Sequence, residues 1–130
     1  MKFNFTAPIG IAVALAAVAP AEAATVRQFS TAGFEAAQRQ GRPILVDVYA
    51  DWCPVCRAQH EALGRILPRQ QFKDLAVFRL DFDSQKDAWR GLGVQRQSTL
   101  IMFRGRKEVG RLVAASDPQS IEQLLGTGLR

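Results

Sequence analysis

The sequence predicts an α/β fold in which a mixed central sheet is covered by helices on both faces. Strand-like and helix-like patterns follow one another in the order β-α-β-α-β-α-β-β-α, within a length of 130 residues that suggests one domain. Residues 44–50 form a nearly continuous apolar run, which is typical of a strand buried on both faces, as in parallel sheets. Cys53 and Cys56, the only cysteines, follow this run at the expected start of a helix.

The first half of the domain is predicted to contain two strands and two helices. We expect a short strand at residues 25–29 and a helix at residues 34–40, which Gly41 and Pro43 terminate. The apolar run is the second strand. Pro54 suits the first turn of the next helix, because its missing N–H would have no partner there. This helix is expected to run to residue 67, before Pro68, and its apolar residues recur at helical spacing at Val55, Ala58, Ala62, Leu63, Ile66 and Leu67.

The second half is predicted to contain three strands and two helices. Residues 77–82 alternate between apolar Phe78, Leu80 and Phe82 on one face and Arg79 and Asp81 on the other. A short helix is expected at residues 88–92. Residues 99–103 and 108–113 are predicted strands, and the segment RGRK between them is a hairpin signature. Asp117 is expected to cap the last helix, with Pro118 at its first position and with Ile121, Leu124 and Leu125 on its buried side.

Residues 1–23 have the organisation of a secretory signal peptide. Lys2 provides a positive start, residues 9–18 are apolar or small, and Ala21-Glu22-Ala23 offers a cleavage site, with Ala19-Pro20-Ala21 as a second candidate. The apolar run is shorter than the ~20 residues that a membrane anchor needs. We therefore expect cleavage near Ala23, a mature domain at residues 24–130, and export to an oxidising compartment, where disulfides persist.

The chain is basic, with a formal net charge of +5. The expected leader holds one lysine and one glutamate, so the mature chain keeps this value. A basic surface attracts nucleic acid, anionic lipid or acidic proteins. The basic residues near the predicted hairpin have no interleaved aromatic residues and match no nucleic-acid motif, so we interpret them as solvated and expect no nucleic-acid partner; they are Arg104, Arg106, Lys107 and Arg111.

The spacing of Cys53 and Cys56 points to redox chemistry. A disulfide between them closes a very small loop, so it removes little unfolded-state entropy and stabilises the fold weakly. Cys53 lies at a helix N-terminus, where unpaired N–H groups and the helix dipole stabilise a thiolate. That thiolate would attack a substrate disulfide, and Cys56 would then resolve the mixed disulfide. An inert disulfide and half of a metal site are the alternatives.

Over residues 25–125 the chain resembles the thioredoxin family. Four features in order carry the resemblance: ILVDVYADWC at residues 44–53, the redox pair CPVC at 53–56, the central strand VFRLD at 77–81, and LGV at 92–94 followed by STLIMFRG at 98–105. The resemblance implies the thioredoxin fold and a redox-active Cys53–Cys56 disulfide. Together with the leader it is similar to exported bacterial members, including reductases that serve cytochrome c maturation, and so implies a periplasmic protein.

Asp47 is an ionisable residue inside an apolar strand, so it must find a partner or hold its proton. In the resembled family this position holds a buried acid that handles the proton of the resolving cysteine, which implies Asp47 as the proton acceptor for Cys56. Arg79 falls where the family often has a lysine near that acid, and we expect it to tune Asp47. The alternative is a structural Asp47, paired with the backbone or with Arg79.

Trp52 is expected to cover the redox pair and to contact substrate, whereas Pro54 and Val55 influence the redox potential. The family places a cis-proline before the Thr-Leu of its fourth strand, beside the cysteines, but this chain has Gln97, Ser98 and Thr99 there. A cis bond before a residue other than proline costs about 3–4 kcal/mol, so we expect a trans Gln97–Ser98 bond. This change would move the backbone groups that pair with a substrate strand in the family. It also adds a Ser98 hydroxyl near the sulfurs that can hydrogen-bond a thiolate.

We therefore predict a periplasmic thiol-disulfide oxidoreductase that acts as a protein-disulfide reductase, with Cys53 as nucleophile and Cys56 as resolving thiol. The direction rests on Asp47 with Arg79 and on the lack of a histidine between the cysteines, which the strong oxidants of the superfamily often have. The expected partners are disulfide-containing exported proteins as substrates and a membrane electron-transfer protein as reductant. We expect a monomer that uses no cofactor.

Two other functions fit the same residues. The family often has a proline about five residues after the second cysteine that helps to keep metals off the sulfurs, and this chain has Glu61 there. His60 lies one turn after Cys56, so Cys53, Cys56 and His60 are candidate ligands of zinc or copper in a metal carrier. The second alternative is a thioredoxin-like binding module whose disulfide is structural.

Overall fold

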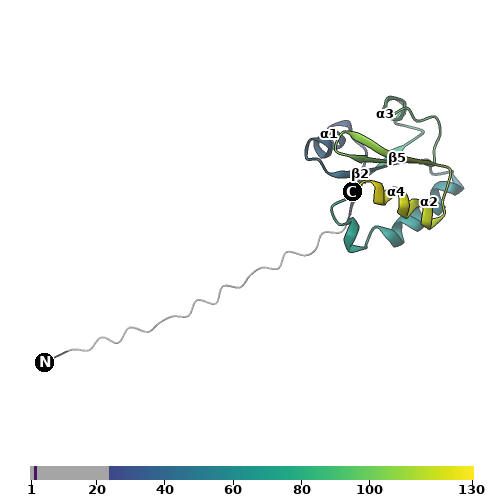
Figure 1. Ribbon diagram of the computed structural model, residues 1–130. Helices are drawn as coiled ribbons and strands as arrows, with labels where there is room; N and C mark the ends of the chain where they lie inside the picture. Colours follow the sequence, from purple (N-terminus) through teal and green to yellow (C-terminus); the bar gives the residue numbers. More distant parts are fainter. Residues whose placement is uncertain (1, 3–23) are drawn as a thin grey trace.

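The computed structural model describes residue 2 and residues 24–130, so the predicted leader lies outside the described residues except for Lys2. Five strands form one sheet in the order β1-β3-β2-β4-β5. The strands β1 (Thr25–Gln28), β3 (Ala76–Asp81) and β2 (Pro43–Tyr49) are parallel to one another. The strand β4 (Thr99–Arg104) pairs antiparallel with β2 and with β5 (Lys107–Val113). The connecting helices are α1 (Thr31–Arg39), α2 (Pro54–Ile66), α3 (Lys86–Gly91) and α4 (Pro118–Thr127) (Figure 1).

Alternate residues of the central strands bury two apolar layers. On one face, the strand side chains pack against α2 and α4; this layer includes Leu45, Val77, Leu100, Met102, Leu63, Ile66, Ile121 and Leu125. On the other face they pack against α1 and α3; this layer includes Ile44, Val46, Phe78, Ile101, Phe34, Ala37 and Trp89. The mixed sheet covered on both faces confirms the predicted fold class. Within β2, Asp47 alternates with Val46 and Val48 and therefore faces α2.

The predicted order of strands and helices is confirmed, but some boundaries differ. The helix α1 begins at Thr31 rather than residue 34, because the Ser30 hydroxyl accepts the Gly33 N–H at 3.1 Å and caps the helix earlier. The structure also adds a short 3-10 helix, η1 (Gln70–Phe72). Asp117 caps α4 as predicted, accepting the Ser120 N–H at 2.8 Å.

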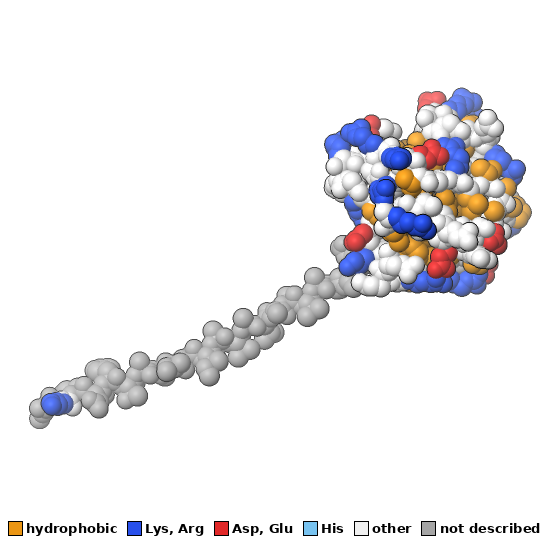
Figure 2. Space-filling view, in the orientation of Figure 1, with side chains coloured by type: hydrophobic (Ala, Val, Ile, Leu, Met, Phe, Trp, Pro, Cys, Tyr) orange, Lys and Arg blue, Asp and Glu red, His pale blue; other side chains and the backbone are white. Residues whose placement is uncertain are grey.

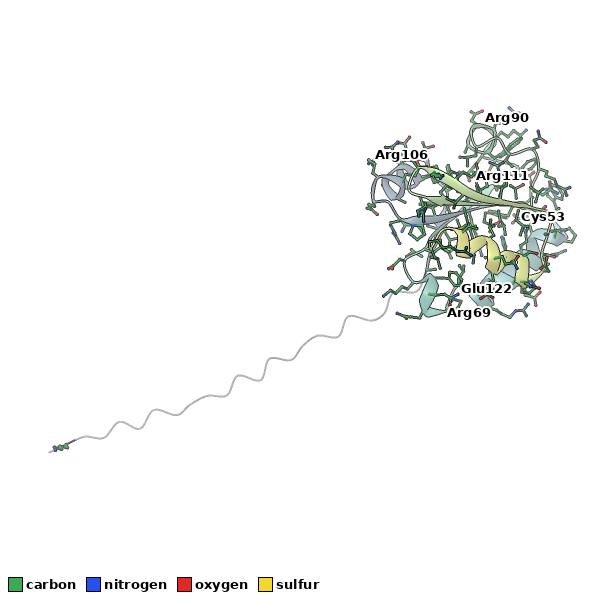
Figure 3. All side chains as sticks on the ribbon, viewed as in Figure 1. Cys53, Arg69, Arg90, Arg106, Arg111 and Glu122 are labelled. Atoms are coloured by element: carbon green, nitrogen blue, oxygen red, sulfur yellow. A yellow bond between two sulfur atoms is a disulfide. The ribbon has the colours of Figure 1, made fainter. Side chains whose placement is uncertain are left out.

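The basic hairpin turns at Gly105 and Arg106, and Figure 3 shows Arg106 at the end of the molecule away from Cys53. Arg111 is not simply solvated, as we had expected of this cluster. Its guanidinium donates to the Glu108 carboxylate and to the carbonyl oxygens of Leu92 and Gly93, at 2.7 and 3.1 Å. This side chain ties β5 to the segment that follows α3.

Charged side chains of both signs are mixed over the face drawn in Figure 2, around a band of hydrophobic ones. Within residues 24–130, no helix has both the length and the apolar character needed to cross a membrane.

Candidate active site

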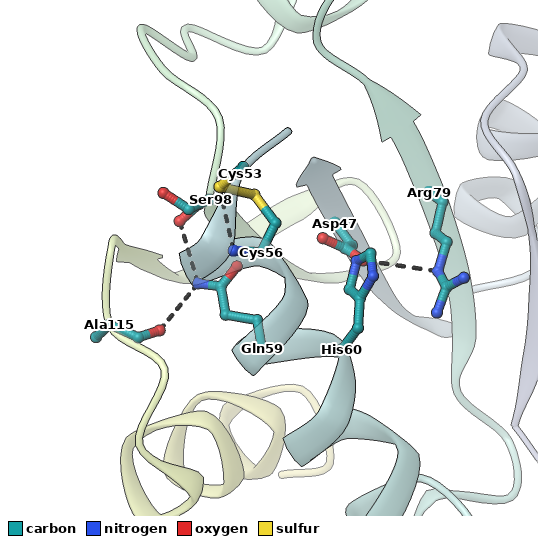
Figure 4. A network of polar contacts seen from close by, with 8 residues as sticks. All are labelled: Asp47, Cys53, Cys56, Gln59, His60, Arg79, Ser98 and Ala115. Carbon is teal, nitrogen blue, oxygen red and sulfur yellow. Dashed lines mark hydrogen bonds and ion pairs between the residues drawn. A yellow bond between two sulfur atoms is a disulfide. The ribbon is translucent and has the colours of Figure 1, made fainter. Parts of the chain in front are cut away.

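The two cysteines form a disulfide at the start of α2, with their Cα atoms 5.3 Å apart (Figure 4). Cys53 is the N-cap residue, and its Sγ accepts the Cys56 N–H at 3.1 Å, while Pro54 occupies the first turn as predicted. The free N–H groups of a helix start favour negative charge, so this position suits a thiolate on Cys53. Only 2% of Cys53 and 1% of Cys56 is exposed. The two side chains pack with Ala50, Tyr49, Val55 and Phe82.

Asp47 is fully buried under α2 and has two basic neighbours, the His60 imidazole and the Arg79 guanidinium. His60 Nε2 lies 2.7 Å from Asp47 Oδ2, and Arg79 Nε lies 3.8 Å from the same oxygen. The register of β2 and β3 places Asp47 directly opposite Arg79, and α2 brings His60 over both (Figure 4). The angles of these contacts are not those of hydrogen bonds, and no donor among the described residues satisfies either carboxylate oxygen. The carboxylate is therefore held by charge rather than by a hydrogen-bond cage.

Two hollows give solvent a route toward these residues. One, of about 240 Å³, is lined by Asp47, His60 and Arg79 together with apolar residues of β1 and α2. The other, of about 230 Å³, is lined by Cys56, Arg57 and Tyr49 and again by His60 and Arg79. Both hollows are lined by His60 and Arg79, so these two side chains border the space beside Asp47 and the space beside Cys56.

Tyr49 lines the hollow at Cys56, and its surroundings change the pKa of its phenol. Burial, and then the negative charges of Asp81 and Asp51, raise the pKa of Tyr49 above its ordinary value. The phenol therefore stays neutral at neutral pH. Its ring lies 5.5 Å from the His60 ring, centroid to centroid.

The predicted metal ligands do not come together. Within the described part of the chain, no cluster of three or more His, Cys, Asp or Glu side chains is arranged to hold a metal ion. Cys53 and Cys56 are bonded to each other, and His60 contacts Asp47. In this disulfide form, Cys53, Cys56 and His60 do not form a metal-binding cluster, and the metal-carrier alternative stays a prediction about the reduced protein.

The predicted substrate loop lies beside the redox pair in an unusual backbone conformation. The Gln97–Ser98 bond is trans, as we expected, since no peptide bond of the described residues is cis. Ser98 has φ = 59°, in the left-handed region that residues other than glycine rarely adopt. Its hydroxyl donates to the Gln97 carbonyl oxygen rather than to a sulfur atom, while the Thr99 hydroxyl donates to the Arg96 carbonyl oxygen at 2.8 Å.

Trp52 projects next to the pair, with 59% of its surface exposed. Its indole Nε1 donates to Asp83 Oδ2 at 2.8 Å, which fixes the ring relative to the loop after β3. An exposed, fixed aromatic ring is available to a substrate.

Two residues of this site were missed by the sequence reasoning. His60 was considered only as a metal ligand, yet its Nε2 lies closer to Asp47 Oδ2 than Arg79 Nε does. Gln59 was not considered, although it is fully buried between Cys56 and the substrate loop. The sequence did indicate Gln59 in one respect: on the predicted helix it lies three positions after Cys56 and therefore on the same side as that cysteine.

Comparison with known proteins supports this description. A sequence model of the family Thioredoxin matches residues 25–127. Thioredoxin-1 of Saccharomyces cerevisiae (strain ATCC 204508 / S288c) is 32% identical over 101 residues, which cover 77% of this chain and 95% of that protein. The thioredoxin of Chlamydia muridarum (strain MoPn / Nigg) is 34% identical over 85 residues, covering 63% of this chain and 78% of that protein.

Solved structures agree with the sequence matches. The crystal structure of Trxlp from Edwardsiella tarda EIB202 superposes with a TM-score of 0.76 at 42% identity, covering 78% of this chain and 98% of that chain. Malassezia sympodialis thioredoxin superposes with a TM-score of 0.71 at 17% identity, which supports the fold alone.

Proposed function

Because this chain belongs to the thioredoxin family, we propose that it is an exported reductase of protein disulfides. The chain is a thioredoxin-type thiol-disulfide oxidoreductase with Cys53 and Cys56 as its redox pair. The observation that supports the reducing direction is the buried Asp47, which His60 and Arg79 connect to the hollow at Cys56.

The reduced pair transfers two electrons in two exchange steps. The Cys53 thiolate attacks a substrate disulfide, so a Cys53–substrate bond forms, the substrate S–S bond breaks, and the released thiolate takes a proton from water. Cys56 then gives its proton to Asp47 and attacks the Cys53 sulfur. The Cys53–Cys56 bond forms, the mixed disulfide breaks, and the second substrate thiolate leaves and is protonated.

Asp47 is suited to accept that proton because it is shielded from bulk water but linked to solvent. His60 is one-quarter exposed, with 23% of its side chain accessible, and Arg79 is 41% accessible. The positive charge of Arg79 offsets the carboxylate when it is ionised, and His60 offers a route by which the proton leaves. An imidazole is suited to this because one ring nitrogen can accept a proton while the other donates one.

The proposed location is the periplasm, with the leader removed near Ala23. The substrates are disulfide-containing exported proteins, and a membrane electron-transfer protein supplies the electrons. Thioredoxins act on disulfides and are themselves reduced by reductases; one similar protein, from Mycobacterium leprae, is named a bifunctional thioredoxin reductase/thioredoxin. The exposed Trp52 and the segment from Gln97 to Thr99 are the proposed substrate contacts.

The reduction potential of the Cys53–Cys56 couple tests the direction. Equilibration with glutathione is expected to give a value at or below about −230 mV, towards that of thioredoxin. A value near about −120 mV, which is that of a strong oxidant, would overturn the reductase assignment.

A pair of variants tests the roles of the two sulfurs. Cys56→Ala is expected to accumulate mixed disulfides with periplasmic proteins, because the resolving thiol is missing. Cys53→Ala is the matched control and is expected to trap none.

The mature protein recovered from the periplasm is expected to begin at Ala24, whereas a cytoplasmic protein that retains the leader would contradict export.

A further inference from the structure

Gln59 is a buried polar residue that connects three parts of the site. It lies on α2, three residues after Cys56, and none of its surface is exposed. Its side-chain Nε2 donates to the Ser98 carbonyl oxygen at 3.2 Å and to the Ala115 carbonyl oxygen at 2.9 Å. A carboxamide nitrogen has two hydrogens, so both are used.

These two contacts determine which way the carboxamide faces. Both partners are carbonyl oxygens and can only accept, so the NH₂ group must lie on their side. The carboxamide oxygen, Oε1, therefore lies on the opposite side, toward Cys56, as Figure 4 shows. Oε1 is buried and receives no hydrogen bond from any residue that the structure describes. A buried acceptor without a donor is rare enough to need a physical explanation.

Gln59 holds two segments, the substrate loop at Ser98 and the segment after β5 at Ala115. Ser98 and Ala114 both have left-handed backbone conformations, with φ of 59° and 57°. The Ala114 N–H donates to the same Ser98 carbonyl oxygen at 2.9 Å. Gln59 thus fastens the loop before β4 to the segment after β5, and it does so from the helix that carries the resolving cysteine.

We propose that Gln59 is a positioning residue whose Oε1 accepts a hydrogen bond from the Cys56 thiol in the reduced protein. In the disulfide, Cys56 has no proton to donate, and this leaves Oε1 without a partner. Reduction supplies the missing donor. When Cys56 passes its proton to Asp47 during resolution, the hydrogen bond breaks and Gln59 is released from the sulfur. The inference rests on the proposed redox function and adds a link between the oxidation state of Cys56 and the two loops.

The vibration of a single thiol tests this link directly. The chain has two cysteines, so Cys53→Ser leaves Cys56 as its only S–H group. In that protein, the Raman S–H stretch is expected at a lower frequency than that of an alkanethiol in an apolar solvent, because a donated hydrogen weakens the S–H bond. Adding Gln59→Leu, which keeps the size but removes the acceptor, is expected to raise the frequency. The matched control is Gln123→Leu on the exposed side of α4, which is expected to leave the band unchanged.

A band that does not move in Gln59→Leu means that Cys56 donates elsewhere, Asp47 included, and overturns the proposal. If Gln59→Leu does not fold, the S–H band of the Cys53→Ser protein is the remaining readout. A frequency as high as that of an alkanethiol in an apolar solvent shows a thiol without an acceptor and also overturns the proposal.

The redox equilibrium of the two-cysteine protein provides a second readout. Gln59→Leu removes a hydrogen bond of the reduced form and an unpartnered oxygen of the oxidised form, so both changes favour the disulfide. The equilibrium constant for oxidation by glutathione is expected to rise roughly two- to tenfold. An unchanged constant contradicts the role of Gln59. The absolute potential of the wild-type protein tests the reductase function separately, so the two failures are distinguishable.

Discussion

Replacing Asp47 by asparagine is expected to make the protein more stable and, at the same time, slower. Asp47 has no exposed surface, and neither of its oxygens has a hydrogen-bond donor among the residues described. Asparagine has nearly the same shape and carries no charge. The change therefore removes the burial of a carboxylate without creating a cavity.

The magnitude follows from the cost of burying the carboxylate and from its attraction to Arg79. Burying a carboxylate costs several kcal/mol even after the protein relaxes, so its attraction to neighbouring groups must offset that desolvation cost. At a separation of 3.8 Å and an effective dielectric constant of about 20, the Coulomb attraction between Arg79 and Asp47 is at most about 4 kcal/mol. Arg79 is 41% accessible, so water screens much of this attraction. His60 carries a charge only when it is protonated, so Arg79 is the permanent positive charge beside Asp47. We expect Asp47→Asn to raise the free energy of unfolding by about 1–3 kcal/mol at pH 8.

Urea unfolding and turnover measure the two effects. The urea midpoint should rise, while reduction of a protein disulfide should slow by about 100-fold, the lower end of what a general base contributes. The matched control is Asp74→Asn, the same change at an exposed position outside any helix, which should alter neither. A lower midpoint for Asp47→Asn would mean that the ion pair stabilises the fold and would refute the energetic reasoning. Unchanged turnover would refute the role of Asp47 as proton acceptor.

Three further predictions concern single residues. Ala114→Gly should raise the free energy of unfolding by about 0.5–1 kcal/mol in urea titrations, because a left-handed conformation costs alanine about 1–2 kcal/mol and the larger unfolded-state entropy of glycine cancels only part of this gain; a loss of stability would contradict the left-handed conformation of Ala114, at φ = 57°. Tyr49 is the only tyrosine, and its tyrosinate absorbance should appear with a midpoint above 10 in the folded protein and fall back on unfolding, since burial and the nearby Asp81 and Asp51 raise its pKa. The folded state favours the protonated phenol, so the contribution of Tyr49 to stability is present below the ordinary value and is lost as the pH rises through the raised one. Asp117→Ala should lower Tm by about 4 °C at neutral pH through loss of the α4 cap. The backbone N–H of Ser120 lowers the pKa of Asp117, so this difference should shrink as the pH falls through the lowered value, and a pH-independent difference would argue against a charged cap.

The sequence predicted the architecture well because the periodicity of apolar residues reports which face of each element is buried. The run at residues 44–50 indicated a strand buried on both faces, and β2 lies between β3 and β4 in the sheet. Local capping chemistry also predicted the start of α4 at Asp117. The same chemistry at Ser30 was overlooked, so the predicted start of α1 was three residues late.

The contacts within the site were less predictable because they join elements that are distant along the chain. The pairing of Asp47 with Arg79 followed from the family resemblance and is seen as a 3.8 Å ion pair. The contact of His60 with Asp47 depends on how far α2 rotates about its axis, which the apolar pattern does not determine to within one residue. The same rotation buries Gln59 and leaves Val55 and Ala58 half-buried, although the pattern predicted the latter two on the core side.

The burial of both sulfurs affects how fast the redox pair reacts with small thiols and oxidants in solution. With only 2% and 1% of the two cysteines exposed, a small thiol or oxidant in solution collides mostly with the surrounding side chains. Exchange requires an approach to sulfur, so its rate depends on access as well as on potential. A partner that docks and displaces the covering side chains gains access that a free small molecule lacks. Burial is therefore expected to slow thiol–disulfide exchange between this protein and small thiols in solution, even where the redox potentials favour that exchange.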